Sequence, residues 1–190
     1  PVPKPLEVML TIPYPSAQQT DFGDVDGDGV SEDLSLPGTR EAAVAWYVDR
    51  ALEQWERLDA PDLHLWGFYW TREGITDADP EVIRHTAALV HERGYRLLWI
   101  PWFRAPGFER WADLDFDVAI LQPNYAFLPQ HLGKVRNDRL VETATLARGL
   151  GMGVEMEISY GPERRSSPAT RSVFRRPFAH PRILSVAVPA

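Results

Sequence analysis

Two glutamates stand two positions apart in the apolar stretch GMGVEMEI, which covers residues 151–158. Side chains alternate between the two faces of a β-strand, so Glu155 and Glu157 are predicted to lie on one face and the apolar residues between them on the other. Neighbouring acids disfavour each other's ionisation, which lets one stay protonated as a proton donor while the other is charged. The spacing therefore predicts an acid–base pair, with Glu157 as the general acid and Glu155 as the carboxylate that tunes it.

A third carboxylate follows the aromatic stretch LHLWGFYW of residues 63–70. Glu73 is expected on the loop just beyond that strand, where it can serve as the second catalytic carboxylate across a cleft. Two structural alternatives stay open. Glu73 could be an exposed loop acid, and Glu155 and Glu157 could form ion pairs with Arg or Lys, because Glu is rarely buried without a partner.

Polar and aromatic side chains gather near the ends of the predicted strands. The stretch DVAILQPN ends in two amide side chains on the face opposite its apolar residues. Aromatic faces suit stacking on the apolar faces of sugar rings, and the alternative for each aromatic residue is core packing. The expected substrate-binding residues are Gln122, Asn124, Tyr125, Tyr69, Trp70, Trp99 and Trp102.

An acidic loop, DFGDVDGDGVSEDL, covers residues 21–34. Calcium takes six to eight oxygen ligands, and acids at alternate positions around a glycine can wrap them around one ion. The expected ligands of a structural calcium are Asp24, Asp26, Asp28, the carbonyl of Val30, and Glu32. The twelfth position is Ser35 rather than the bidentate Glu of a helix–loop–helix site, so the loop is typical of extracellular calcium modules. The alternative is a solvated acidic turn.

The elements that must position these residues alternate along the chain. Apolar runs predict strands over 6–12, 63–70, 95–103, 117–124 and 151–158, with a weaker sixth over 183–188. Helical periodicity and end signals predict helices over 41–58, 79–94 and 137–151, the second capped by Asp79. This alternation predicts a parallel sheet covered on both faces. We expect an α/β fold, a partial or complete (β/α) barrel of TIM type, with a doubly wound open sheet as the alternative.

Composition and net charge limit the classes of partner and of chemistry that this chain can have. The chain has 190 residues, 44% of them hydrophobic, no cysteine, and a formal net charge of −7. That charge disfavours a nucleic-acid partner, and no apolar run approaches the ~20 residues that membrane insertion needs. The lack of cysteine excludes disulfides, thiol catalysis and thiolate metal sites.

The net charge changes from negative to positive near the end of the chain. Residues 161–190 contain six arginines against one acid and show neither helical nor strand periodicity. We therefore expect a barrel-like domain over residues 1–160. The Arg/Pro/Ser-rich tail over 161–190 is expected to replace or truncate the end of the barrel.

Five segments carry a family resemblance. In order, VMLTIPYP, GFYWTRE, VHERGYRLLWIPWFRAPG, FDVAILQPNYAF and GMGVEMEI resemble the bacterial family called domain of unknown function 4855, over about residues 6–160. The resemblance implies a barrel similar to those of glycoside hydrolases, in secreted or surface proteins, and brings no established reaction. It points to Glu73, Gln122, Asn124, Tyr125, Glu155 and Glu157.

The function expected from these observations is carbohydrate chemistry outside the cell or at its surface. We expect a glycoside hydrolase that acts on a polysaccharide or oligosaccharide through paired glutamates. One alternative is a noncatalytic carbohydrate-binding or cell-surface module. Another is an inactive, truncated copy of the family, so enzyme activity is left open.

Overall fold

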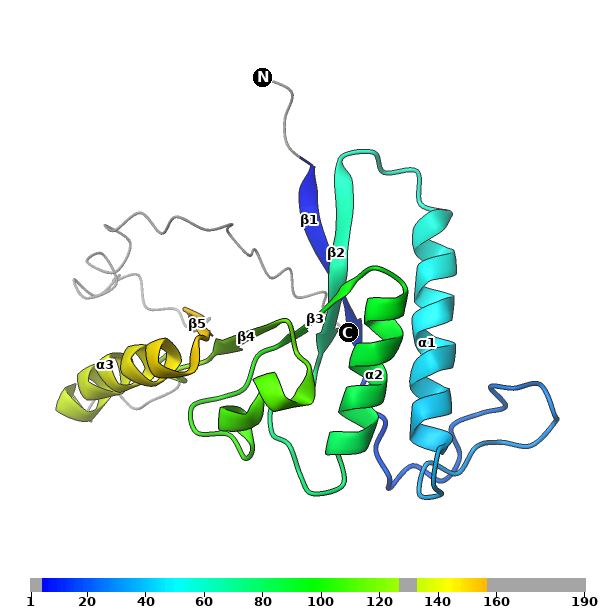
Figure 1. Cartoon of the computed structure of the whole chain (residues 1–190), viewed down its shortest axis with the longest axis horizontal. Coiled ribbons are helices and arrows are strands. Elements are labelled where there is room, and N and C mark those ends of the chain that lie inside the picture. Colours follow the sequence, from blue (N-terminus) through cyan, green and yellow to red (C-terminus); the bar gives the residue numbers. More distant parts are fainter. Residues whose placement is uncertain (1–4, 127–132, 157–190) are drawn as a thin grey trace. The chain divides into compact units, whose positions relative to one another are not determined.

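The computed structural model describes residues 5–126 and 133–156, which lie in one compact unit, Pro1–Glu157. In chain order the elements are β1 (Leu6–Ile12), α1 (Thr39–Glu56), β2 (Leu63–Trp70), α2 (Pro80–Glu92), β3 (Arg96–Trp99), the 3₁₀ turns η1 (Phe108–Arg110) and η2 (Ala112–Leu114), β4 (Val118–Leu121), α3 (Gly133–Leu150) and β5 (Gly153–Val154) (Figure 1). β1 and β2 have the predicted bounds, whereas β3, β4 and β5 are shorter. The tail over 161–190 and the sixth strand candidate lie outside the described residues.

The five strands form one parallel sheet in the order β1-β2-β3-β4-β5. This order follows the chain without reversal, whereas a doubly wound sheet reverses its order at a switch point. The α/β prediction is confirmed, and the described part is consistent with a segment of a (β/α) barrel. Among these five strands β1 and β5 are the edges, so the described sheet is open.

One face of the sheet carries the core. Ile12, Trp70, Trp99 and Ala119 lie opposite one another on four neighbouring strands, and each is at most 1% exposed. The cluster that contains them also takes residues from the helices: Val44, Val48, Val82, Ile83, Ala87, Val90 and Ala147. Helices α1, α2 and α3 therefore all pack on this one face, as the outer helices of a barrel do.

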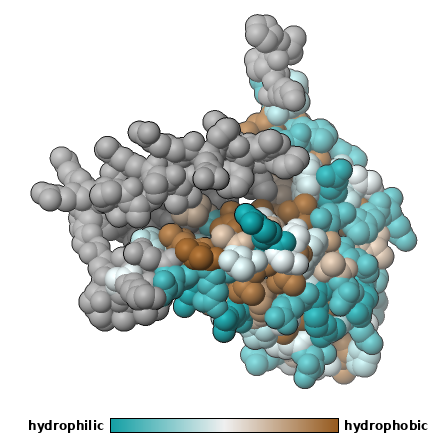
Figure 2. All heavy atoms as spheres, turned by 60° about the vertical axis from the view of Figure 1, so that its left-hand side comes forward, coloured by the Kyte–Doolittle hydropathy of each residue, from teal (hydrophilic) through white to brown (hydrophobic). Residues whose placement is uncertain are grey.

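The opposite face carries a second row, in which Thr11, Tyr69, Leu98 and Val118 are register partners. Figure 2 shows apolar side chains gathered across the middle of one face of the molecule, with hydrophilic side chains around them. Val154 was expected to pack against helices. It is 40% exposed because β5 is the last strand of the described sheet.

A glycine allows close contact between β2 and β3. A Cβ at Gly67 would lie 2.1 Å from the carbonyl oxygen of Arg96, a distance that no side chain can adopt. The register with β1 also shifts here, since Val8 pairs with Leu65 but Met9 pairs with Gly67. The bulge and the glycine together determine the path of the C-terminal half of β2. They therefore influence the positions of Tyr69 and of the loop that follows the strand.

Candidate functional site

Two of the three predicted catalytic acids come together. Glu155 follows β5, where its backbone N–H donates a hydrogen bond to the carbonyl of Leu121 at 3.1 Å. Glu73 lies on the loop between β2 and α2. Burial, followed by the negative charge of Glu73, raises the pKa of Glu155 above its ordinary value. The charge of Glu73 therefore reaches Glu155, and both residues follow the C-terminal ends of strands, at the edge of the sheet where parallel α/β folds place their sites.

Two further predicted residues join the pair. The side-chain amide of Gln122 donates a hydrogen bond to Oε1 of Glu73 at 3.1 Å. Burial, followed by the charges of Glu73 and Glu155, raises the pKa of Tyr69 to about 12. Tyr69 thus keeps its phenolic proton at neutral pH and can donate it in a hydrogen bond. The sequence alternation that placed Glu155 and Gln122 on the polar face agrees with this arrangement.

The loop that carries Glu73 is anchored at several points. The hydroxyl of Thr71 donates to the carbonyl of Ile12 at 2.8 Å, and the indole N–H of Trp99 donates to the carbonyl of Arg72 at 2.8 Å. Beyond Glu73, the N–H of Ile75 donates to the carbonyl of Pro106 at 2.8 Å. Glu73 is therefore held by β1, by β3 and by the loop after β3, which fixes its backbone relative to the sheet.

The expected sugar-stacking roles of Trp70 and Trp99 do not fit their positions. Both rings lie on the helix-covered face, and they are 1% and 0% exposed. Trp99 stacks on Phe116 with ring centroids 5.2 Å apart, and Trp70 meets Tyr14 edge to face at 6.0 Å. Their faces are in contact with the protein itself, so they act as core residues.

Trp102 is placed differently. It is partly buried, pairs with Gln122 in an isolated parallel bridge, and lines a small pocket with Glu73. The pocket has a volume of about 330 Å³, and its other lining residues are Arg72, Gly74, Thr76 and Pro106. Of the three tryptophans expected to stack on sugars, Trp102 is the one that lies in a pocket beside Glu73, where a sugar ring could reach it.

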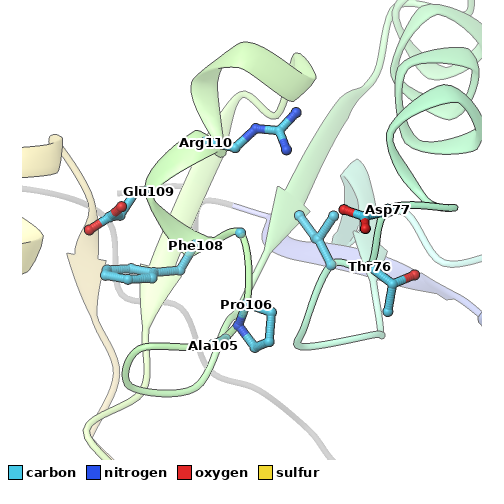
Figure 3. A pocket seen from close by; sticks show the side chains of 9 residues that line it. Thr76, Asp77, Ala105, Pro106, Phe108, Glu109 and Arg110 are labelled. Atoms are coloured by element: carbon cyan, nitrogen blue, oxygen red, sulfur yellow. The ribbon is translucent and has the colours of Figure 1, made fainter.

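A second pocket adjoins this one. Its volume is about 390 Å³, and it shares Thr76 and Pro106 with the first pocket. Figure 3 shows Asp77 and Glu109 on opposite sides of it, with Arg110 above. Its lining residues are Ile75, Thr76, Asp77, Ala105, Pro106, Gly107, Phe108, Glu109 and Arg110. Since the residues that line it do not include Glu73, we take the smaller pocket as the part of the surface that adjoins this carboxylate.

Three predicted site residues remain, two in the segment after β4 and one outside the described residues. Asn124 and Tyr125 are partly buried in the turn after β4, where Asn124 has a φ of 52°. Asparagine tolerates this left-handed conformation better than most residues, so Asn124 suits the turn itself. Glu157 lies outside the described residues.

The acidic loop brings three carboxylates together. Oxygen atoms of Asp24, Asp26 and Asp28 lie within 4.8 Å of one another, and all three residues are exposed. Both carboxylate oxygens of Asp24 accept backbone N–H groups, from Gly27 at 2.6 Å and Gly29 at 2.9 Å. Three convergent oxygens fit part of a calcium ligand set.

Of the last two expected ligands, Glu32 lies outside this cluster of carboxylates. Glu32 accepts the N–H of Val25 with both oxygens, at 3.0 and 3.1 Å, which closes the loop instead of joining the cluster. Val30, whose carbonyl was expected as a ligand, is 66% exposed, and its N–H donates to Asp28 at 2.7 Å.

A buried network near the site escaped the sequence analysis. Arg40 donates to Oδ1 of Asp79 at 2.8 Å, and the side chains are 9% and 1% exposed. Tyr14 also donates to Asp79 at 2.8 Å, and Thr76 does so through its N–H and its hydroxyl. Asp79 is the N-cap residue of α2, as predicted, but its carboxylate accepts hydrogen bonds from these partners and forms no capping hydrogen bond with the helix. The network joins the loop after β1, the start of α1 and the start of α2.

Across the described parts of the chain, no helix combines the length and apolar character required to cross a membrane. Both eighteen-residue helices, α1 and α3, carry many charged residues.

Comparison with known proteins gives one family. No curated protein and no solved structure matches the chain. The family model described as a domain of unknown function, DUF4855, matches residues 3–173, which includes every strand of the sheet and runs past residue 160, where the resemblance was expected to end. The chain therefore belongs to the DUF4855 family.

Proposed function

We propose that the chain is a carbohydrate-active enzyme, a glycoside hydrolase whose catalytic carboxylates are Glu155 and Glu73. The observation that carries the proposal is the hydrogen bond from Gln122 to Glu73 at the C-terminal edge of a parallel sheet, with Glu155 and Tyr69 close enough for the charge of Glu73 to raise the pKa of each. Glycoside hydrolysis needs one protonated and one ionised carboxylate on either side of the scissile bond. An arrangement that raises the pKa of one acid through the charge of another meets this need.

In this mechanism Glu155 takes the role that the sequence had suggested for Glu157. Its raised pKa suits a general acid, which donates its proton to the glycosidic oxygen as the bond from the anomeric carbon breaks. Glu73, oriented by the amide of Gln122, either activates a water molecule or attacks the anomeric carbon itself. Tyr69 donates a hydrogen bond to a neighbouring carboxylate or to the sugar. A polysaccharide or oligosaccharide outside the cell, or at its surface, is the proposed substrate.

The positions of the aromatic residues favour an enzyme over a noncatalytic binding module. Such modules hold sugars on exposed aromatic faces. Two of the aromatic residues that could have formed this platform, Trp70 and Trp99, are buried in the core. Glu73, in contrast, lines a pocket with Trp102, and its charge raises the pKa of Glu155.

A screen of polysaccharides for released sugars tests the proposal. The wild-type protein is compared with Glu155→Gln and Glu73→Gln, which keep the shape of the side chain and remove its acid. General acid–base groups contribute ~10²- to 10⁴-fold, so we expect each variant to lose at least ~100-fold in rate. Glu109→Gln, in the adjoining pocket, is the matched control and should keep full activity.

Two outcomes would contradict the proposal. Hydrolysis that survives in both variants removes Glu155 and Glu73 from the mechanism. A wild-type protein that binds a glycan but never cleaves it is a noncatalytic binding module, or an inactive member of the family.

A further inference from the structure

The pocket beside Glu73 contains an arginine with no acidic partner. Arg72 is exposed and lines this pocket together with Glu73 and Trp102. Within residues 5–126 and 133–156, four arginines form ion pairs with acids, namely Arg40, Arg50, Arg93 and Arg104. Arg72 forms none there. An arginine that lines a pocket and forms no ion pair there has a guanidinium group that is available to a ligand.

Arg72 is nevertheless fixed in place. Its guanidinium carbon lies 4.3 Å from the centroid of the Tyr14 ring, and its Nε donates to the carbonyl of Gly74 at 3.3 Å. Tyr14 is fixed in turn by its hydrogen bond to Asp79, and the guanidinium of Arg40 lies 5.3 Å from the same ring. The buried network around Asp79 thus extends through Tyr14 to the side chain of Arg72.

This arrangement suits the recognition of an anion. Stacking on Tyr14 occupies one face of the guanidinium, and Gly74 occupies its Nε. The two terminal nitrogens can then present parallel N–H groups, a geometry that matches a carboxylate or a sulfate with two hydrogen bonds. Because the side chain is already held, less conformational entropy is lost when a ligand binds.

We propose that Arg72 binds an anionic substituent, a carboxylate or a sulfate, on a sugar ring that lies in the pocket against Trp102. The glycan would then be an acidic one, a uronate polymer or a sulfated polysaccharide. The assignment of a glycan rests on the proposed function, whereas the anion site rests on Arg72 alone. Arg110 in the adjoining pocket shares that pocket with two acids, Asp77 and Glu109, whereas Glu73 is the one acid that lines the pocket of Arg72.

Binding can be measured without any hydrolysis. The isotope-labelled full chain is titrated with glucuronate, glucose 6-sulfate and glucose, and the amide of Gly74 and the indole N–H of Trp102 are followed by NMR. We expect both anionic sugars, or one of them, to shift these signals at millimolar concentration, and glucose to bind at least ~10-fold more weakly. Glucuronate and glucose 6-sulfate distinguish the carboxylate from the sulfate.

Three variants sharpen the test. Arg72→Gln should abolish the preference for the anionic sugar. Arg72→Lys keeps the charge but loses the two-pronged geometry, so it should weaken binding ~10-fold. Arg110→Gln removes the same charge from the adjoining pocket and should bind as the wild type does. If Arg72→Gln does not fold, the wild-type comparison of glucuronate with glucose still decides the question.

The inference is overturned if glucose binds as tightly as both anionic sugars, or if Arg72→Gln keeps the preference. The experiments distinguish failure of the anion site from failure of the proposed hydrolase activity. Cleavage of a neutral glycan that depends on Glu155 but not on Arg72 refutes the anion site and leaves the hydrolase. Arg72-dependent binding without cleavage of any acidic glycan supports the anion site and refutes the hydrolase.

Discussion

The indole N–H of Trp99 donates a hydrogen bond to the carbonyl of Arg72 at 2.8 Å. Trp99 is completely buried on the helix-covered face of β3, and Arg72 immediately precedes Glu73. A core residue therefore holds the backbone of the loop that carries both the proposed catalytic acid and the proposed anion-binding arginine. Its contribution to function is made through the position of the loop.

Trp99→Phe should show that Trp99 contributes to activity, through the position of the loop, as well as to stability. Phenylalanine keeps an aromatic ring in the core but removes the donor, so we expect a stability loss of roughly 1–3 kcal/mol from the lost hydrogen bond and the smaller ring. Glycan hydrolysis should fall as well, because Glu73 loses an anchor. Trp111→Phe is the matched control: its indole donates to the carbonyl of Leu150 at 2.9 Å, away from the acids. Urea unfolding and hydrolysis rates are measured on both, and equal activity losses would exclude the positioning role.

Asp79→Asn should be strongly destabilising. It removes the charge that compensates Arg40 in a buried environment, and breaking such a pair costs about 3–5 kcal/mol. Asp49→Asn is the control, because the Asp49–Arg93 pair is largely exposed and exposed pairs contribute about 0–1 kcal/mol. Urea unfolding at pH 7 measures both. Similar losses in the two variants would contradict a special role for the buried pair.

The same residue predicts a pH dependence. Burial alone raises the pKa of Asp79, but hydrogen bonds from Arg40, Thr76 and Tyr14 outweigh burial and hold the pKa below its ordinary value. A lowered pKa gives stability that is fully present above the unfolded-state pKa, about 3.9, and that is lost as the pH falls through the folded-state pKa. Wild type should therefore lose stability below about pH 4, and Asp79→Asn should show a smaller loss over the same range.

Glu155→Gln should have the opposite pH behaviour. The folded-state pKa of Glu155 is raised, so its contribution is present below the unfolded-state pKa of about 4.3 and is lost as the pH rises through the folded-state pKa. The glutamine variant never acquires the disfavoured charge. We expect it to be more stable than wild type at pH 7 and no more stable at pH 4, while its hydrolytic activity is lost. Thermal unfolding at the two pH values measures this, and a variant that is less stable at pH 7 would contradict it.

Gly67→Ala should destabilise the sheet. A Cβ at this position would contact the Arg96 backbone at 2.1 Å, and relief requires movement of β2 against β3, with a cost of about 1–3 kcal/mol or more. Gly149→Ala is the control, because α3 offers open space there and alanine favours a helix over glycine by about 0.5–1 kcal/mol. The two substitutions should change the unfolding midpoint in opposite directions. A neutral Gly67→Ala would show that β2 and β3 are not so close.

We expect the acidic loop to bind calcium with the weak affinity of extracellular modules, with a Kd of about 10⁻⁴–10⁻³ M. At ~10 mM calcium, binding to the folded chain alone would add roughly 1.4–2.7 kcal/mol and raise Tm. Asp26→Asn should remove the increase, and magnesium at the same concentration should give a smaller one, because it loses its water reluctantly. A Tm unchanged by calcium would leave the loop a solvated turn.

Side-chain alternation explains which of the predicted site residues lie on the polar face of the sheet and which do not. It placed Glu155 on the polar face of its strand beside Gln122, and the structure agrees. The same rule, applied to Tyr69 and Trp70, puts these neighbours on opposite faces. Proximity to a strand end alone suggests Trp70 and Trp99 as site residues. Their positions in the alternation place both rings on the face that the helices cover.

Other features depended on tertiary contacts that no local pattern records. Asp79 before Pro80 has the sequence of a helix cap, but its partner Arg40 stands far away along the chain and competes successfully for the carboxylate. The segment between β3 and β4 forms 3₁₀ turns where a barrel usually has an α-helix. β5 is short because a strand extends only as far as its neighbour pairs with it, and β4 itself ends at Leu121.

The order of the strands has a consequence for synthesis of the chain. Each strand after β1 pairs with the strand made just before it, so in the described sheet only β1 must wait for a later partner. Chains emerge from the ribosome at about 5–20 residues per second, slowly enough for each strand and helix to dock on the preceding ones. The slowest step should be the first, because β1 can pair with β2 only after α1 and the whole acidic loop have been made and the long connection between them has closed. Growth of the sheet would then proceed by addition at a single edge, as it does in stacked-repeat proteins.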